Sequence, residues 1–306
     1  MLPAFSQSLP PKPKWSVDDI PDLSGKVMIV TGGNTGVGKE TVKALLQHNA
    51  TVYLAARDAE KAKQTIEDLK STTGKEAAFL HLDLSDLRIV RKSAEDFLSR
   101  EKRLHVLFNN AGVMACPMNL LTEQGYDMQI GTNVIGHYFF TSLLLPALEA
   151  ASITGDKARI VTTSSLVAYF AKDFIFDAVK DGPRRRKLNP RELYNISKLG
   201  DALLALELSR RWDDKIVSVA VNPGNIKTDL QRHMPGWQRP LVNLMLYPSP
   251  MGALSQLWAG VSPEGASLNG LFIIPWARVG TAPAKAQDHA LAEKLWSWVD
   301  DLCRGY

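Results

Sequence analysis

Short apolar runs alternate with longer amphipathic runs along most of the chain. The short runs predict strands at Val27–Thr31, Thr51–Ala55, Ala77–Leu82, Val106–Asn109, Arg159–Thr163, Ile216–Val221 and Leu271–Ile274. Short apolar runs bounded by turn residues are typical of strands that are buried on both faces. Alternation with helical runs predicts an α/β fold, in which one doubly wound parallel sheet carries helices on both faces.

The first 22 residues have a different composition. Prolines at positions 3, 10, 11 and 13 interrupt any regular element, so residues 1–22 are expected to form an extended arm outside the fold. Residues 23–306 are long enough for one large core and are expected to form a single domain.

A glycine-rich turn follows the first predicted strand directly. The run T-G-G-N-T-G-V-G places Gly32, Gly36 and Gly38 between this strand and a helical run from Lys39 to His48. Glycines let the backbone turn tightly, so that its N–H groups and the positive end of the next helix can face a phosphate. The spacing G-x-x-x-G-x-G differs from the more widespread G-x-G-x-x-G of dinucleotide-binding domains.

Tyr194 and Lys198, in the run Y-N-I-S-K, are four residues apart and therefore share one face of a helix. A free phenol has a pKa near 10, and a nearby ammonium group lowers that pKa. The pair therefore suits proton exchange with an alcohol or a carbonyl group. Taken alone, the spacing is weak evidence and more often describes an exposed helical pair.

Further motifs follow the glycine turn in order: H-L-D-L-S-D (81–86), N-N-A-G (109–112), T-N-V-I-G (132–136), V-T-T-S-S (161–165), Y-N-I-S-K (194–198) and N-P-G (222–224). On these motifs the chain resembles the short-chain dehydrogenase/reductase family, in its retinol dehydrogenase-like and fungal oxidoreductase branches, over roughly residues 24–280. The resemblance implies a Rossmann fold and an oxidoreductase that transfers hydride between a nicotinamide cofactor and an alcohol or carbonyl substrate.

The resemblance also implies four catalytic residues. Tyr194 would exchange the proton of the substrate oxygen, while Lys198 would lower its pKa and bind the nicotinamide ribose. Ser165 would hold the same oxygen, with Ser164 as the competing position. Asn133 would bind a water molecule that links Lys198 to solvent.

The end of the second predicted strand bears on cofactor choice. NAD-specific relatives place an acidic residue where this chain has Ala56, and Arg57 follows it. A guanidinium can pair with the 2′-phosphate of NADP(H), so NADP(H) is expected over NAD(H). Asp58 is the competing acidic residue, but it is expected to cap the next helix. The cofactor-binding residues implied by the resemblance are Gly32, Asn34, Thr35, Gly36, Val37, Gly38, Arg57, Lys61, Asp83, Leu84, Asn110, Ala111, Gly112, Tyr194, Lys198, Pro223, Gly224, Ile226 and Thr228.

Two apolar segments are expected to act as substrate loops, at residues 166–191 and 225–252. The first carries Tyr169, Phe170, Phe174, Ile175 and Phe176, and the second carries Met234, Trp237, Leu241, Leu244, Met245, Leu246 and Tyr247. An apolar lid over a polar centre suits a small lipophilic alcohol or carbonyl substrate. A core cluster or a dimer-facing cluster is an equal alternative.

The charge and cysteine content of the chain limit its possible binding partners and its compartment. A net charge of +4 with dispersed basic residues gives no case for nucleic-acid binding, and the one basic run, residues 184–187, is expected to be solvated. Two cysteines suit a reducing compartment, and the apolar stretch 134–151 is expected to be a core helix and not a transmembrane segment. These features predict a soluble, cytoplasmic protein. The sequence leaves a homodimer open.

The sequence is compatible with two functions from different classes. The first is an NADP(H)-dependent oxidoreductase, and the second is a catalytically silent protein that senses the dinucleotide. Sensors of that kind generally lose the tyrosine or the lysine, whereas this chain keeps Asn133, Ser165, Tyr194 and Lys198 together. The enzyme is therefore favoured.

Overall fold

A computed structural model describes residues 3–152, 156–227 and 246–306. Its centre is an eight-stranded sheet in the order β3-β2-β1-β4-β5-β6-β7-β8. The pairs from β3 across to β7 are parallel, and β8 is antiparallel to β7. The strands are β1 (Val27–Thr31), β2 (Thr51–Ala56), β3 (Ala78–His81), β4 (Val106–Asn109), β5 (Ala158–Thr163), β6 (Ile216–Val221), β7 (Phe272–Ile274) and β8 (Arg278–Gly280).

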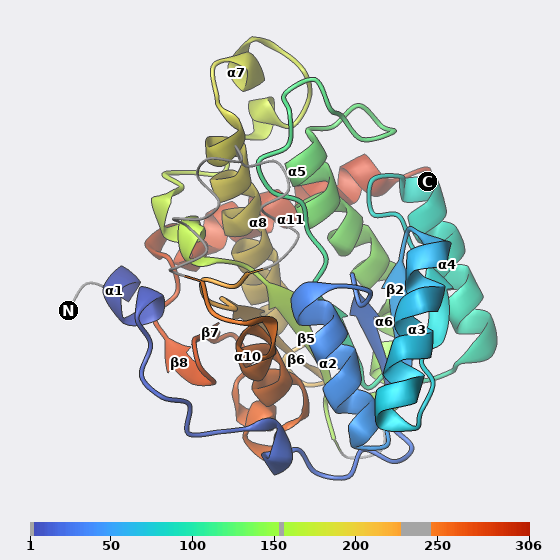
Figure 1. The fold of residues 1–306 in the computed structure, drawn as a ribbon. Coiled ribbons are helices and arrows are strands. Elements are labelled where there is room, and N and C mark those ends of the chain that lie inside the picture. Colours follow the sequence, from blue (N-terminus) through green and yellow to red (C-terminus); the bar gives the residue numbers. More distant parts are fainter. Residues whose placement is uncertain (1–2, 153–155, 228–245) are drawn as a thin grey trace.

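Helices cover both faces of the sheet (Figure 1). One face packs against α2 (Gly36–Gln47), α3 (Ala59–Thr73) and α10 (Ser249–Val261). The other packs against α4 (Leu87–Arg100), α6 (His137–Ser152), α8 (Pro190–Arg211) and α11 (His289–Cys303). Each face has its own cluster of buried apolar residues, as expected for a doubly wound sheet whose strands are buried on both sides. The predicted fold class is confirmed.

The predicted strands all form, and their ends differ by at most one residue from the prediction. The antiparallel β8 was not predicted, because its three residues R-V-G carry no apolar alternation. The helix after the glycine turn begins at Gly36, three residues before the predicted start at Lys39. The glycines of the turn therefore form its first helical turn.

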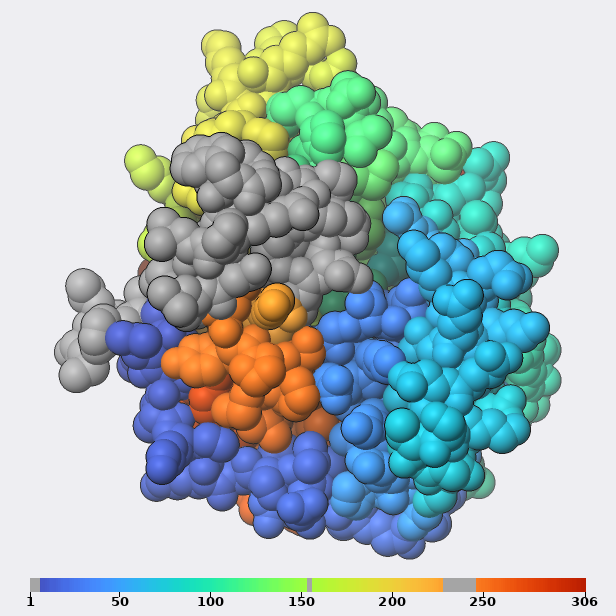
Figure 2. Space-filling view, in the orientation of Figure 1, coloured from blue at the N-terminus to red at the C-terminus, as the bar shows by residue number. Residues whose placement is uncertain are grey.

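The expectation of an extended arm outside the fold is wrong for parts of residues 1–22. A short helix, α1 (Pro3–Ser8), precedes an irregular stretch and a 3₁₀ turn at Val17–Asp19. Gln7 is only 2% exposed, and Ile20 belongs to the core on the α2 side. In Figure 2 the N-terminal segment runs along the surface below α10 and α2. The prolines prevent regular structure here without preventing packing against the domain.

The most apolar helical run is part of the core. Within the described residues, Met128–Ser152 is the one run long and apolar enough to span a membrane, and 67% of its most apolar window is buried inside the fold. It consists of α5 (Met128–Ile130), a π-helical turn (Gly131–Gly136) and α6. This agrees with the prediction of a core helix for 134–151.

Candidate active site

The glycine turn lies at the carboxyl end of β1. Gly32 has φ = +67°, a conformation that favours glycine, and a Cβ atom on Gly38 would overlap the carbonyl oxygen of Gly32. Thr35 is the N-cap of α2, so Gly36, Val37 and Gly38 form its first turn. The backbone N–H groups of this turn have no helical acceptor and can face an anion.

A residue that the sequence reasoning passed over connects this turn to the next motif. The Thr31 hydroxyl accepts the backbone N–H groups of Asn110 and Ala111, both at 2.9 Å. The Asn110 amide donates to the Thr31 carbonyl oxygen at 2.8 Å. The two predicted cofactor-binding segments are thereby held together at adjacent strand ends. Thr31 could have been suspected, since it stands first in the glycine motif.

The end of β2 carries the residues on which the prediction of cofactor choice depends. Ala56 is buried, and Arg57 is exposed with no hydrogen bond or ion pair among the described residues. Asp58 caps α3 by accepting the N–H of Lys61, as predicted, and also pairs with its ammonium group at 3.6 Å. The Thr65 hydroxyl donates to the Asn34 carbonyl oxygen, which holds α3 against the glycine turn.

The remaining predicted cofactor residues also follow strand ends. Asp83 and Leu84 follow β3, where Oδ1 of Asp83 accepts both the N–H and the hydroxyl of Ser85. Pro223, Gly224 and Ile226 follow β6, and Gly224 has φ = +89°. Parallel strands place their carboxyl ends at one edge of the sheet, so these segments share the edge that carries the glycine turn. Thr228 lies outside the described residues.

The two neighbouring serines at the end of β5 face different partners. Ser164 is buried, and its hydroxyl donates to the carbonyl oxygen of Lys198 at 2.7 Å. The Ser165 hydroxyl lies near the Tyr194 phenol, whose pKa it lowers slightly, and it accepts the N–H of Val167. The geometry therefore favours Ser165 over Ser164 as the residue that faces a substrate.

Tyr194 and Lys198 lie on α8 and are both buried. The Lys198 ammonium is 5.8 Å from the centre of the Tyr194 ring. Burial raises the pKa of the Tyr194 phenol, and the positive charge of Lys198 opposes that rise without cancelling it. The predicted lowering by Lys198 is thus present, but in the protein alone burial outweighs it. Desolvation was not visible in the sequence.

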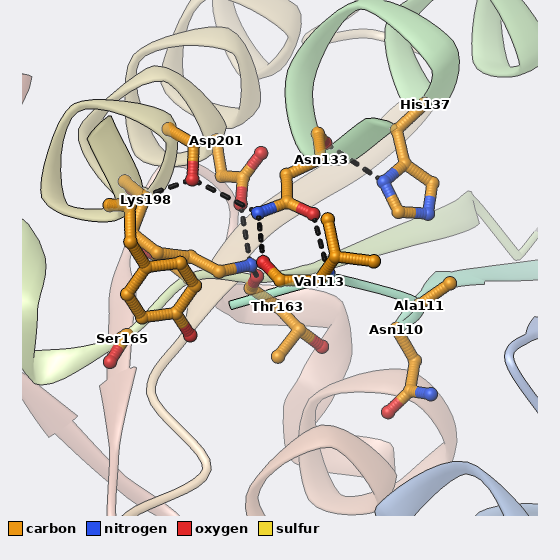
Figure 3. Close-up of polar contacts among 12 residues, drawn as sticks. Asn110, Ala111, Val113, Asn133, His137, Thr163, Ser165, Lys198 and Asp201 are labelled. Carbon is orange, nitrogen blue, oxygen red and sulfur yellow. Dashed lines mark hydrogen bonds and ion pairs between the residues drawn. The ribbon is translucent and has the colours of Figure 1, made fainter. Parts of the chain in front are cut away.

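Asn133 lies in the π-helical turn before α6, a feature that often marks functional positions. Its side-chain oxygen accepts the N–H of Val113, and its amide donates to the Val113 carbonyl oxygen and to the Ser197 hydroxyl. Figure 3 shows this side chain beside Val113, close to the end of Lys198. The side chain therefore fixes the loop after β4, and its role toward a water molecule stays a prediction.

A second unpredicted residue binds the lysine. The Lys198 ammonium donates to the carbonyl oxygen of Thr163 and to the Asp201 carboxylate, both at 2.8 Å (Figure 3). The backbone of Gly112 lies beside this group: a Cβ atom there would be 3.7 Å from the Lys198 nitrogen and 3.3 Å from the Asn133 side-chain oxygen. Asp201 could have been found from its spacing, because residues three apart share a helical face.

The first predicted substrate loop is mostly packed against the domain. Phe174 is buried and meets Trp298 of α11, while Tyr169 packs edge-to-face on Phe272 of β7. Phe170 is the exception at 61% exposure. Phe174 and Tyr169 therefore pack against the core, which was the alternative to a substrate lid. Phe170 remains exposed and could still contribute to a lid.

The basic run 184–187 is not uniformly solvated, which corrects the expectation for it. Arg185, in the short helix α7 (Pro183–Arg186), is 3% exposed and pairs with Asp127 at 2.9 Å. Asp127 also caps α5, so the ion pair fastens the loop to the helix that leads to Asn133. No local pattern in the sequence indicates this ion pair, because its two residues are 58 positions apart.

The second predicted substrate loop is described only at its ends. Ile226 pairs with Tyr247, and Tyr247 packs edge-to-face on Trp276. Leu246 is half-buried. The other apolar residues predicted for this lid lie outside the described residues: Met234, Trp237, Leu241, Leu244 and Met245.

The fold and the site together define a class of protein, an oxidoreductase of the dinucleotide-binding α/β type. The profile of the short chain dehydrogenase family matches residues 26–176. A short-chain dehydrogenase/reductase of Armillaria gallica is 58% identical over 303 residues, which cover 99% of this chain and 98% of the relative. The chain belongs to the short-chain dehydrogenase/reductase family, as its motifs predicted.

Two more distant likenesses agree with this assignment. Human retinol dehydrogenase 11 is 36% identical over 284 residues, which cover 92% of this chain and 86% of the relative. The structure of a Pseudomonas aeruginosa RhlG/NADP active-site complex superposes with a TM-score of 0.66 at 25% identity, covering 84% of this chain and 96% of the other.

Proposed function

We propose that this chain is an NADP(H)-dependent oxidoreductase that interconverts a small lipophilic alcohol and its ketone or aldehyde. The observation that carries the proposal is the grouping of the Ser165 hydroxyl, the Tyr194 phenol and the Lys198 ammonium at the end of β5, where Ser165 and Lys198 both lower the pKa of the phenol. Two hydroxyl groups that lie this close can both bind one substrate oxygen.

Each residue of this group has a distinct part in the reaction. In reduction, the Tyr194 hydroxyl gives its proton to the carbonyl oxygen, while Ser165 donates a hydrogen bond to the same atom. In oxidation, Tyr194 takes the proton from the alcohol. The Lys198 charge makes the phenolate less costly in a buried site. Bound NADP(H) supplies the hydride in reduction and accepts it in oxidation.

The residues that would hold NADP(H) fit that molecule. The glycine turn has no room for a side chain at Gly38, and bare backbone at Gly112 lies beside Lys198. Arg57 offers an unpaired guanidinium, and Ala56 brings no carboxylate that would repel a 2′-phosphate. The solved complex with NADP, noted above, supports the same cofactor.

The substrate class is inferred from the residues next to Ser165. Leu166 and Val167 are half-buried and Phe170 is exposed, so apolar surface adjoins the catalytic serine. The retinol of the human relative's name is a lipophilic alcohol and is consistent with this class.

The test is a panel of lipophilic aldehydes, ketones and alcohols followed by NADPH absorbance, with NADPH binding measured separately by fluorescence. Turnover of at least one compound that Tyr194→Phe abolishes is expected. NADPH binding without turnover across the panel would favour the silent sensor instead. Failure to bind NADPH would overturn the proposed function altogether.

A further inference from the structure

Asp201 lies one turn beyond Lys198 on α8 and is absent from every motif that identified the family. It is 3% exposed, and its Oδ2 is 2.8 Å from the Lys198 ammonium nitrogen. Carboxylates are seldom buried unless they are paired, because removing their charge from water is costly. A buried acid at this position therefore needs a reason.

Lys198 is the group that this acid contacts. An ammonium has three N–H donors. Within the described residues, one goes to the Thr163 carbonyl oxygen and one to Asp201, which leaves one donor for another partner. Two fixed acceptors on the same nitrogen determine where the third donor points.

Other ionisable groups around Asp201 do not compensate its charge. His137 of α6 lines the same cavity, but burial lowers its pKa to about 4, so it is neutral at pH 7. Burial raises the pKa of Tyr138, also on α6, and its hydroxyl donates to Asp300 of α11. Burial raises the pKa of Tyr194 as well. Lys198 is the cation that faces Asp201 in the part of the chain that the structure describes.

Asp201 also lines a small cavity of about 20 Å³, whose exposed wall is mostly apolar. Asn109 lines this cavity and is buried, and its side-chain oxygen has no hydrogen-bond partner among the described residues. An apolar wall compensates little of the hydration that a carboxylate loses on burial. The Lys198 ammonium is therefore the contact that compensates the charge of Asp201.

We propose that Asp201 is a positioning residue for this enzyme: its carboxylate fixes the Lys198 ammonium between Thr163 and Tyr194 and keeps it charged. The inference rests on the proposed function, since it concerns how Lys198 serves NADP(H) and Tyr194. Asp201 itself touches neither the cofactor nor the substrate.

The charge balance of the pair gives the proposal a measurable consequence. Burial alone lowers the pKa of Lys198, but the charge of Asp201 and the hydrogen bond to it, with a further contribution from Tyr194, raise it above its usual value. Burial also raises the pKa of Asp201, to about 6, which leaves both groups charged at pH 7 and above. Without the carboxylate, desolvation would dominate and Lys198 would lose its proton at a lower pH.

The experiment is fluorescence titration of NADPH against the full chain at pH 7 and pH 9.5, for the wild type and Asp201→Asn. Near neutral pH the two proteins should bind NADPH with similar affinity, because Lys198 is protonated in both. At the higher pH the variant should bind at least about tenfold more weakly, as expected for losing a charged hydrogen bond. The wild type should change little between the two conditions.

Glu207→Gln is the matched control. Glu207 lies on the same helix, is also buried, and pairs with Arg210 and Arg211, away from Lys198. Its variant should show the wild-type ratio of affinities at the two pH values. If Asp201→Asn does not fold, Asp201→Ser, which keeps an acceptor and leaves room for water, is measured in its place.

The outcomes are distinct. A loss of affinity that is the same at both pH values would mean that Asp201 only supports packing, and this overturns the inference while the proposed function stands. A wild type that binds no NADPH at either pH overturns both. A loss confined to the higher pH, absent in Glu207→Gln, supports the inference.

Discussion

Replacing each of the two serines at the end of β5 by alanine separates catalysis from stability. Ser165→Ala removes a hydroxyl that lies near the Tyr194 phenol and adjoins apolar surface. Ser164→Ala removes a buried hydroxyl that donates to the Lys198 carbonyl oxygen at 2.7 Å. The two changes delete the same atom from adjacent residues, so each serves as the other's control.

The two variants should differ in what they lose, turnover in one case and free energy of unfolding in the other. Loss of a donor to the reacting oxygen costs roughly 10²–10³ in kcat, so Ser165→Ala should lose about that much turnover with little change in stability. Loss of one buried hydrogen bond costs about 0.5–1.5 kcal/mol, so Ser164→Ala should lose that much free energy of unfolding. Its turnover should stay within about fivefold of wild type, since 1 kcal/mol at the barrier is about a factor of five.

The assay is steady-state kinetics on the best substrate of the panel, together with urea denaturation of both variants. A Ser164→Ala variant that loses more turnover than Ser165→Ala would contradict the reasoning, and it would place the catalytic hydroxyl one residue earlier. Equal losses in both would mean that the Lys198 carbonyl contact matters for the site as a whole.

Arg57→Leu should weaken NADPH binding by about tenfold and leave NADH binding unchanged, as fluorescence titration of both cofactors would show; equal losses would refute the 2′-phosphate role. Tyr194→Phe should keep NADPH affinity but lower turnover by roughly 10²–10⁴, and wild-type turnover would refute its part as acid and base. Arg185→Ala leaves a buried carboxylate unpaired and should cost about 3–5 kcal/mol in urea denaturation, whereas the exposed Arg186→Ala should cost under about 1 kcal/mol. His137 has a folded pKa of about 4, below the unfolded value near 6.5, so the unfolded state binds its proton first and stability falls by roughly 3 kcal/mol as the pH drops through this window. His137→Gln should therefore lose less stability than wild type between pH 7 and pH 4, and parallel losses would contradict the burial argument.

The sheet could be predicted from sequence because its strands are buried on both faces. Such strands appear as continuous apolar runs, and the helices between them fix the parallel order. The edge strand β8 escaped prediction because three residues with an exposed Val279 carry no such pattern. The N-terminal segment was misplaced for a related reason: proline content reports local conformation, and the burial of Gln7 and Ile20 depends on distant partners.

Only those residues of the candidate site that belong to sequence motifs could be predicted. Spacing on α8 placed Tyr194 and Lys198 together, and register at the strand end favoured Ser165. The partners of Arg185 and Asn133 come from other parts of the chain, so no local pattern announced them. The net pKa shift of Tyr194 could likewise not be predicted from the sequence, because desolvation depends on the packed structure.

One face of α8 arranges the whole candidate site. Tyr194, Ser197, Lys198 and Asp201 are spaced at i, i+3, i+4 and i+7, so all four side chains lie along the same side of the helix. Tyr194 lies near Ser165, and the Ser197 hydroxyl accepts from the Asn133 amide. Lys198 donates to the Thr163 carbonyl oxygen and to Asp201.

Because all four side chains lie on α8, their geometry depends on the position of this single helix. The flank of α8 at Gly200 is also closely packed, because a Cβ atom there would lie 2.9 Å from the Phe174 ring and 3.0 Å from Val134. The loop that carries Phe174 therefore packs tightly against α8. The segment 166–191 was expected to form a substrate lid, but its buried aromatic residue Phe174 instead holds the helix that carries Tyr194 and Lys198 in place.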